Sequence, residues 1–528
     1  MTIRIAPITR RKFLAAVGST GVAAVSHPSL TWGSSEKVLR VRSNSDIQGI
    51  DPLNPAAGAD QDVMMAVFNK LVAYKPILGS GSASGGWDWQ LEAATSVEQV
   101  DPTHVRFTLM PGIMWTNGFG EMTTDDVKFS FERHAKQESW TAVDWDPLKE
   151  VKIVDKYTGI LEFNKPFAPL FNSTLPYGSG TIVCKAAVEQ LPDQKFSVEP
   201  PATSGPYKIE SWKPKQKLVL TRHDGWPGPR PTFDRIEIIP IDDPKTAEIA
   251  FEAGQLDMTG IAASSLTRYQ QQLPDQTSMR VYPSLYYEWL GMNVDHAPFD
   301  DERVRKAVQH AVDVNAILDV AYFGAADRAT GIIAPGLPGH RDSNKINQIN
   351  LDKARSLLAE AGLADGFKTT LDVHNITDHM SAAQVIQANL AQVGIEVQIN
   401  SHDSGTFWTL GLESEGDAWK GVQMVYNRYS MAPDPYWATA WFTPAQIGEW
   451  NWERWNSPRY GELHEAAVME TNAEKRHDMY VEMQDLMEDS GAYVFVTHNI
   501  NGFLYKNSIV PAMRPDGGNM MFRYFESS

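Results

Sequence analysis

The fold class is indicated most directly by residues 369–399. They begin with Thr369-Thr-Leu-Asp-Val373, continue through Ser381-Ala-Ala-Gln-Val-Ile-Gln-Ala-Asn-Leu-Ala-Gln-Val393 and end with Gly394-Ile-Glu-Val-Gln-Ile399. The two short outer runs are rich in apolar and β-branched residues and predict strands, whereas the longer middle run predicts a helix. Gly394 suits the left-handed position that ends such a helix. A strand, a helix and a strand in succession indicate an α/β lobe.

The same alternation extends outward from this stretch. Helices are predicted at 301–320 and at 351–361, the second ended by Gly362. Toward the N-terminus we predict helices at 62–74 and 245–251, and strands at 38–42, 105–109, 204–209, 217–221 and 235–241. A chain of 528 residues is long enough for more than one hydrophobic core. These elements together predict two mixed α/β lobes.

The charge and the cysteine content exclude several classes of function. A net charge of -18 argues against nucleic-acid binding, which needs clustered Lys and Arg, and against a basic membrane-surface protein. The single cysteine, Cys184, excludes an internal disulfide, an iron–sulfur cluster and a cysteine-rich zinc site. We expect Cys184 to be a small buried apolar residue.

The first residues read as an export signal. Thr9-Arg-Arg-Lys-Phe-Leu14 precedes the apolar run 15–25, which is the arrangement of a twin-arginine signal peptide. That run is too short to span a membrane, which takes about 20 residues. We therefore expect residues 1–34 to be a removable signal peptide, cleaved between Ala24 and Ser35. The mature protein is expected in the periplasm, not embedded in the membrane.

Four further segments carry a resemblance to a known family. They are Leu109-Met-Pro-Gly-Ile-Met-Trp-Thr-Asn-Gly118 with Thr123-Thr-Asp-Asp-Val-Lys-Phe-Ser-Phe-Glu-Arg133, Thr203-Ser-Gly-Pro-Tyr-Lys-Ile-Glu-Ser-Trp212, Leu290-Gly-Met-Asn-Val294 with Pro298-Phe-Asp-Asp-Glu-Arg-Val-Arg-Lys-Ala307, and Leu351-Asp-Lys-Ala-Arg-Ser-Leu-Leu-Ala-Glu-Ala-Gly362. In this order they resemble the family 5 extracellular solute-binding proteins, the oligopeptide-, dipeptide- and nickel-type receptors of ABC importers.

The resemblance implies an α/β, two-lobed periplasmic-binding-protein fold (type II-like, cluster C) with an extra subdomain in lobe one. Lobe one would comprise 35–290, with the inserted subdomain near 76–200, and the C-terminal return 498–528. Lobe two would comprise 291–497. The implied function is import of a peptide or peptide-like small solute, without catalysis and without a cofactor. The lobes would close on the solute, and a monomer would deliver it to the transmembrane permease subunits.

The resemblance also points to ligand-binding residues in Tyr426-Asn-Arg-Tyr-Ser-Met-Ala-Pro-Asp-Pro435. In peptide-binding members an aspartate that pairs the peptide ammonium stands where this chain has Met431, so we expect an anionic solute rather than a plain peptide with a free N-terminus. Arg428 offers a planar fork for a carboxylate or phosphate, with an ion pair to Asp434 as the alternative. The remaining candidates are Asn427, the aromatic walls Tyr429, Trp437 and Trp408, and backbone groups of Ala56 and Gly58.

Two other functions stay open at this point. A nickel or metal-chelate receptor would use His374 and His379 with the neighbouring Asp372 and Asp378. An exported hydrolase is the second, although the chain has neither a His-Glu-x-x-His motif nor a Gly-x-Ser-x-Gly motif. The first predicts a bound metal and the second predicts turnover.

Overall fold

Three larger β-sheets organise the part of the chain that the computed structural model describes, residues 36–54, 58–79, 87–136, 139 and 141–528. The expected signal peptide, residues 1–34, lies outside these described residues. Within them, no helix is both long enough and apolar enough to cross a membrane.

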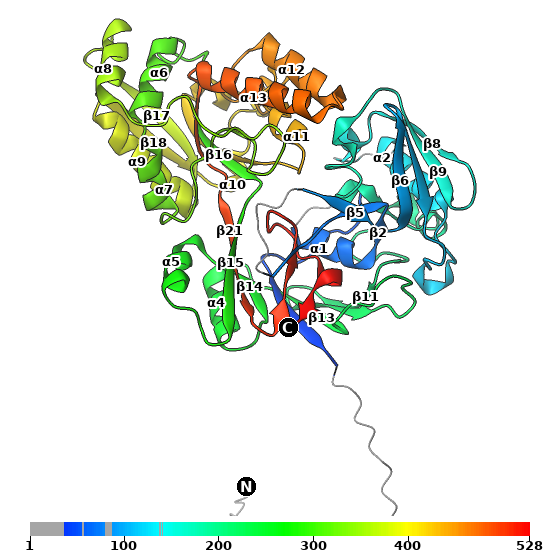
Figure 1. Cartoon of the computed structure of the whole chain (residues 1–528). Helices are drawn as coiled ribbons and strands as arrows, with labels where there is room; N and C mark the ends of the chain where they lie inside the picture. The colour runs from blue at the N-terminus through cyan, green and yellow to red at the C-terminus, as the bar shows by residue number, and fades with distance from the viewer. Residues whose placement is uncertain (1–35, 55–57, 80–86, 137–138, 140) are drawn as a thin grey trace, which may run out of the picture. The chain divides into compact units, whose positions relative to one another are not determined.

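A seven-stranded sheet forms the centre of lobe one, with strands in the order β11-β12-β13-β1-β14-β21-β15. The strands are β11 (Tyr207–Lys213), β12 (Lys217–Arg222), β13 (Arg235–Pro240), β1 (Val38–Ser43), β14 (Met258–Gly260), β21 (Ile500–Lys506) and β15 (Thr277–Pro283). β21 comes from the end of the chain and pairs antiparallel with both β14 and β15 (Figure 1). Helices α4 (Pro244–Glu252) and α5 (Ala263–Gln271) pack on this part of the sheet.

A five-stranded sheet forms the centre of lobe two, in the order β18-β17-β19-β16-β20. The strands are β18 (Ile395–His402), β17 (Phe367–His374), β19 (Met424–Ser430), β16 (Tyr286–Met292) and β20 (Tyr493–Thr497). The main helices of this lobe are α6 (Glu302–Ala311), α7 (Val314–Ala321), α8 (Leu351–Glu360), α9 (Thr377–Ala391), α11 (Pro435–Ala440), α12 (Pro458–Met469) and α13 (Ala473–Asp489) (Figure 1). Their apolar faces and the sheet bury two neighbouring hydrophobic cores.

A third, four-stranded sheet is antiparallel throughout, in the order β6-β7-β9-β8. Its strands are β6 (Ala94–Asp101), β7 (His104–Leu109), β9 (Thr158–Phe163) and β8 (Leu148–Ile153). Helix α2 (Thr124–Lys136) packs against β8. A short 3₁₀ helix, η2 (Ala142–Asp144), follows α2 and leads into β8.

The strand–helix–strand prediction for residues 369–399 is confirmed. β17 and β18 are parallel neighbours joined by α9, and Gly394 follows the helix with a φ of +85°. The helix predicted at 351–361 is likewise present as α8, and Gly362 follows it with a φ of +79°. These positive φ angles are the conformation that glycine adopts most readily, so both helix ends are fixed by local sequence.

Two predicted helices are wrong in their extent. The helix predicted to reach Tyr74 is α1 (Gly58–Val67) and ends early, because the backbone N–H groups of Ser204 and Gly205 donate to the Val67 carbonyl. The helix predicted at 301–320 is interrupted between α6 and α7. Asp313 caps the second helix by accepting a hydrogen bond from the Ala316 backbone, so the chain restarts there instead of continuing.

The chain crosses between the two large sheets at two adjacent places. One crossing lies between β15 and β16, at Ser284, and the other lies between β20 and β21, at Asn499. The Ser284 backbone N–H donates to the Asn499 carbonyl over 3.3 Å, and the Asn499 side-chain amide donates to Glu288 over 3.0 Å. The two crossings are therefore hydrogen-bonded to each other and to lobe two.

Candidate ligand-binding cleft

Three pockets share lining residues, and two of the three are lined by residues of both lobes. The tryptophan pocket, of about 360 Å³, is lined by Tyr286, Trp408, Arg428, Tyr429, Ser430, Trp441 and Trp450. The Asp144 pocket includes Gln61, Asp144, Tyr177, Ser430, Met431 and Trp437, and the crossing pocket includes Gly58, Ser284, Ser430, Met431, Arg514 and Asp516. Ser430 lines all three, so the pockets adjoin one another, and together they are called the cleft.

Aromatic rings from lobe two form the walls of the tryptophan pocket. Trp408 stacks on Tyr429 with ring centroids 6.3 Å apart, and Trp450 meets Tyr429 edge-on at 6.1 Å. The Tyr429 hydroxyl donates to the Trp450 carbonyl over 2.7 Å, which fixes the ring. Such walls with a few placed polar groups suit a small organic solute.

The guanidinium of Arg428 is held at the mouth of this pocket without a carboxylate partner. It lies 4.9 Å from the centroid of the Tyr286 ring, and no ion pair of Arg428 occurs among the described residues. The alternative pairing with Asp434 is not found, because Asp434 accepts two hydrogen bonds of 2.7 Å from Arg476. The positive charge of Arg428 therefore stays available in the cleft.

Asp434 has a structural role. It is fully buried, and besides pairing with Arg476 it caps α11 by accepting a hydrogen bond from the Tyr436 backbone. The Asn172 side chain, from the part of the chain that follows the four-stranded sheet, also donates to Asp434 over 3.2 Å. This carboxylate therefore links lobe two to lobe one.

Some of the other predicted site residues line the cleft pockets and others do not. Met431 lines the Asp144 pocket and the crossing pocket, and its backbone N–H donates to the Leu285 carbonyl. Trp437 lines the Asp144 pocket and Gly58 lines the crossing pocket. Asn427 is fully buried and lines none of the three pockets, with its side-chain oxygen accepting from the Arg428 backbone. Ala56 lies outside the described residues.

Sequence reasoning missed the charged residues that lobe one contributes. Arg514 and Asp516 line the crossing pocket and pair through two hydrogen bonds of 2.7 Å. Asp144 lines the pocket that bears its name. No motif marks these positions.

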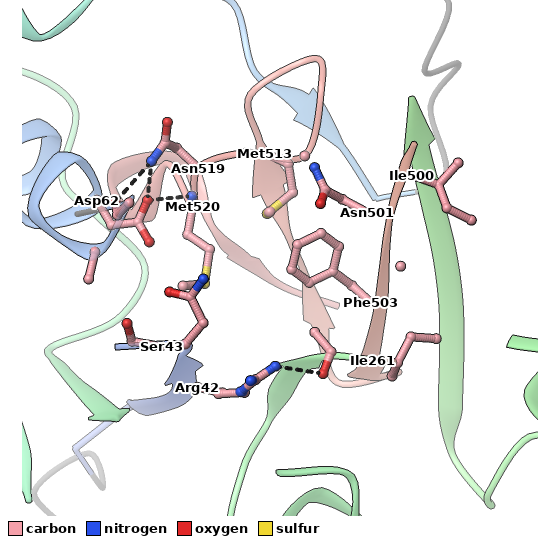
Figure 2. Close-up of a pocket in the computed structure, with 17 residues that line it drawn as sticks. Arg42, Ser43, Asp62, Ile261, Ile500, Asn501, Phe503, Met513, Asn519 and Met520 are labelled. Atoms are coloured by element: carbon pink, nitrogen blue, oxygen red, sulfur yellow. Dashed lines mark hydrogen bonds between the residues drawn. The ribbon is translucent and has the colours of Figure 1, made fainter. Parts of the chain in front are cut away.

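A polar pocket in lobe one adjoins the crossing pocket, since Gly58, Asn501 and Asn519 line both. Figure 2 shows Asp62 and Asn519 next to each other at its edge, where Asp62 accepts hydrogen bonds from the Asn519 amide and the Met520 backbone. Burial raises the pKa of Asp62 to about 7. The cleft thus has a second polar region beside β21.

The residues predicted for a metal site come together only in part: the ring centroids of His374 and His379 lie 6.1 Å apart, but Asp372 does not join them. Asp372 pairs instead with His402 over 2.8 Å, and the His374 ring stacks on Phe407. His379 and Asp378 lie with Glu288 in the one group of three metal-ligand side chains that the described residues contain. Nearby positive charge from Arg428 adds to burial in lowering the pKa of His379, and the same charge opposes a bound cation.

Within the candidate metal cluster, the Glu288 carboxylate is hydrogen-bonded by the protein, whereas neither ring nitrogen of His379 has a hydrogen-bond partner among the described residues. Glu288 accepts from the hydroxyls of Tyr322 and Tyr426 and from the Asn499 amide. Burial, with the charge of Asp378, raises the pKa of Glu288 to about 7. Glu288 therefore connects lobe two to the crossing at Asn499.

Comparisons with known proteins agree with this architecture. The model of the bacterial extracellular solute-binding proteins, family 5 Middle, matches residues 88–448. The chain is 25% identical over 502 residues to the glutathione-binding protein GsiB of Pectobacterium atrosepticum, covering 92% of each chain. It is 24% identical over 493 residues to the dipeptide-binding protein of Escherichia coli, covering 88% of this chain and 89% of that one.

The fold is also similar to a solved structure, that of HbpA2 from Haemophilus parasuis. The TM-score is 0.80 at 21% identity, and the match covers 93% of this chain and 100% of the other. At this identity the likeness bears on the fold, which is the predicted two-lobed α/β architecture.

Proposed function

The chain belongs to the bacterial extracellular solute-binding proteins of family 5 and is the receptor of an ABC importer, and we propose that its solute is peptide-like and carries an anionic group that pairs with Arg428. The observation that carries this proposal is the Arg428 guanidinium, which lines the cleft beside aromatic walls and has no ion pair among the described residues. A guanidinium in such a place matches a carboxylate through two parallel hydrogen bonds.

The names of the relatives support the peptide-like class. One is a glutathione-binding protein and another a dipeptide-binding protein, and both ligands carry carboxylates and peptide bonds. The relatives are binding proteins, which argues for a receptor that releases its solute unchanged.

The binding test is a thermal-shift screen of dipeptides, glutathione and amino-acid–sugar conjugates. A solute at 100 times its dissociation constant should stabilise the protein by about 2.7 kcal/mol.

Binding is proposed to close the cleft by rotation about the two crossings. The boundary expected at 290 falls inside β16, a strand of the five-stranded sheet, so the proposed boundaries between the lobes are the crossings at Ser284 and Asn499. The subdomain near 76–200 would belong to lobe one. The solute would contact both lobes only in the closed state, and this difference in contact drives the population toward closure.

The permease should respond to the closed receptor. In membranes reconstituted with the cognate importer, we expect the solute-loaded protein to stimulate ATP hydrolysis more than the empty protein does, because closure changes the surface that both lobes present. Equal stimulation with and without solute would show that the permease does not recognise closure. The measurement is phosphate release at matched receptor concentrations.

Export is proposed to use the twin-arginine pair. Replacing Arg10 and Arg11 by Lys should leave full-length precursor in the cytoplasm, because lysine lacks the guanidinium that defines this signal. Fractionation followed by mass spectrometry of the N-terminus checks this and locates the cleavage site. Unchanged periplasmic yield of the mature form would contradict it.

A further inference from the structure

One buried aspartate of the cleft, Asp144, lacks the arginine partner that three other buried aspartates have. Asp51, Asp434 and Asp516 are also buried, and each pairs with an arginine through two hydrogen bonds, to Arg133, Arg476 and Arg514 respectively. Asp144 is only 4% exposed, yet it has no cationic partner among the described residues. Its Oδ1 atom is buried and accepts no hydrogen bond there.

The surroundings of Asp144 suit a cation. It lines a pocket of about 140 Å³ together with the rings of Tyr177, Trp437 and Trp441. The two tryptophan rings have centroids 5.9 Å apart. Among the described residues that line this pocket there is no lysine, arginine, histidine or second carboxylate. Aromatic faces attract cations, and a buried carboxylate needs a charge of opposite sign nearby.

We propose that Asp144 binds the primary ammonium group of the solute, so that the solute is dipolar, with its cation at Asp144 and its anion at Arg428. The inference rests on the proposed function and adds the second charge of the ligand. The two charged groups lie in adjoining pockets that meet at Ser430 and Trp441, so one extended molecule can reach both. The cation needs an N–H group because Oδ1 lacks a donor, which favours a primary ammonium over a quaternary one.

Two other occupants of the Asp144 pocket, a water molecule and a metal ion, fit less well than an ammonium group. A water molecule could donate a hydrogen bond to Oδ1, but it would not balance the charge. A metal ion needs several ligands, and Asp144 belongs to no group of three metal-ligand side chains among the described residues. Burial raises the pKa of Asp144 to about 6, with a further contribution from Asp146, while Ser179 and Trp437 oppose the shift.

The proposal is tested with two tripeptide pools of the same sequences, one with free N-termini and one N-acetylated. Both pools keep the C-terminal carboxylate for Arg428, so they differ only at the amine. An equimolar mixture is incubated with the mature protein, and the retained peptides are counted by mass spectrometry. We expect the wild type to favour the free amines by about 30-fold or more, the effect of one buried charge partner.

The matched variants are Asp144→Asn and Asp146→Asn. Asn keeps the shape at position 144 and removes the charge, so the preference should fall toward equality. Asp146 lies two residues away and is exposed, so its variant should retain the wild-type preference. Thermal unfolding of each variant shows whether the fold is intact.

The outcomes separate this inference from the proposed function. If the wild type retains both pools equally, or Asp144→Asn keeps the wild-type preference, the assignment of Asp144 is overturned while a receptor for anionic peptides survives. If the wild type retains neither pool, the peptide-like class fails and this inference fails with it. The first comparison needs no variant, so it stands even if Asp144→Asn does not fold.

Discussion

Replacing Arg476 by Ala should lower the free energy of unfolding by about 3–5 kcal/mol, the cost of leaving one partner of a buried ion pair alone. Arg476 is 3% exposed, and its guanidinium donates to both oxygens of the fully buried Asp434. It also donates to the Tyr480 hydroxyl and the Ala467 carbonyl, so the variant removes the connection between α11 and α13. Chemical denaturation of the mature protein measures the change.

Arg459→Ala is the matched control. Arg459 also pairs with a carboxylate of α13, Glu482, at 2.8 Å, but its side chain is 54% exposed and water screens the pair. We expect a much smaller loss there. If the two variants lose similar stability, the buried pair at Asp434 does not support lobe two as we describe.

Replacing Arg428 by Ala should weaken solute binding by roughly 2–5 kcal/mol while leaving the fold intact. The loss is large because the anionic group of the solute would remain buried in the cleft without its partner. The free energy of unfolding should change little, because the Arg428 guanidinium lies over the Tyr286 ring and forms no ion pair among the described residues. Isothermal titration with the solute found in the thermal-shift screen measures the binding.

Arg454→Ala serves as the control for Arg428. Arg454 also lies over an aromatic ring, that of Trp419 at 4.3 Å, but it pairs with Asp295 and Glu413 and lines none of the cleft pockets. Its variant should bind the solute normally. Normal binding by Arg428→Ala would instead show that the solute anion is held elsewhere, with Arg514 as another guanidinium that lines the cleft.

The fold was predictable where local signals and packing agree. Residues 369–399 combine β-branched strands, an amphipathic helix and a terminal glycine, and all three appear as predicted. The helix predicted to reach Tyr74 failed because Ser204 and Gly205, distant in sequence, bind the carbonyl of Val67. A long-range hydrogen bond of this kind leaves no periodic pattern near residue 67.

The candidate site was predictable on only one of its sides. The segment around Arg428 and Tyr429 is continuous in sequence and lines the tryptophan pocket. Asp144 meets Gln61, Ser179 and Trp437 only after folding, so nothing in the sequence near it indicates a pocket. Met431 lies on one wall of the cleft, whereas the carboxylate that lines the same pocket, Asp144, comes from the opposite lobe.

The position of β21 sets the order in which the molecule can be completed during synthesis. Every strand of the five-stranded sheet ends by Thr497, so lobe two can fold as soon as that residue has left the ribosome. The seven-stranded sheet must wait, because β21 lies between β14 and β15 and pairs with both. Until residues 500–506 arrive, the open edges of β14 and β15 remain available for wrong pairing.

A nascent chain truncated before Ile500 should therefore hold a folded lobe two beside an unfinished lobe one. A transport route that carries folded proteins would have to wait for the last thirty or so residues of the chain.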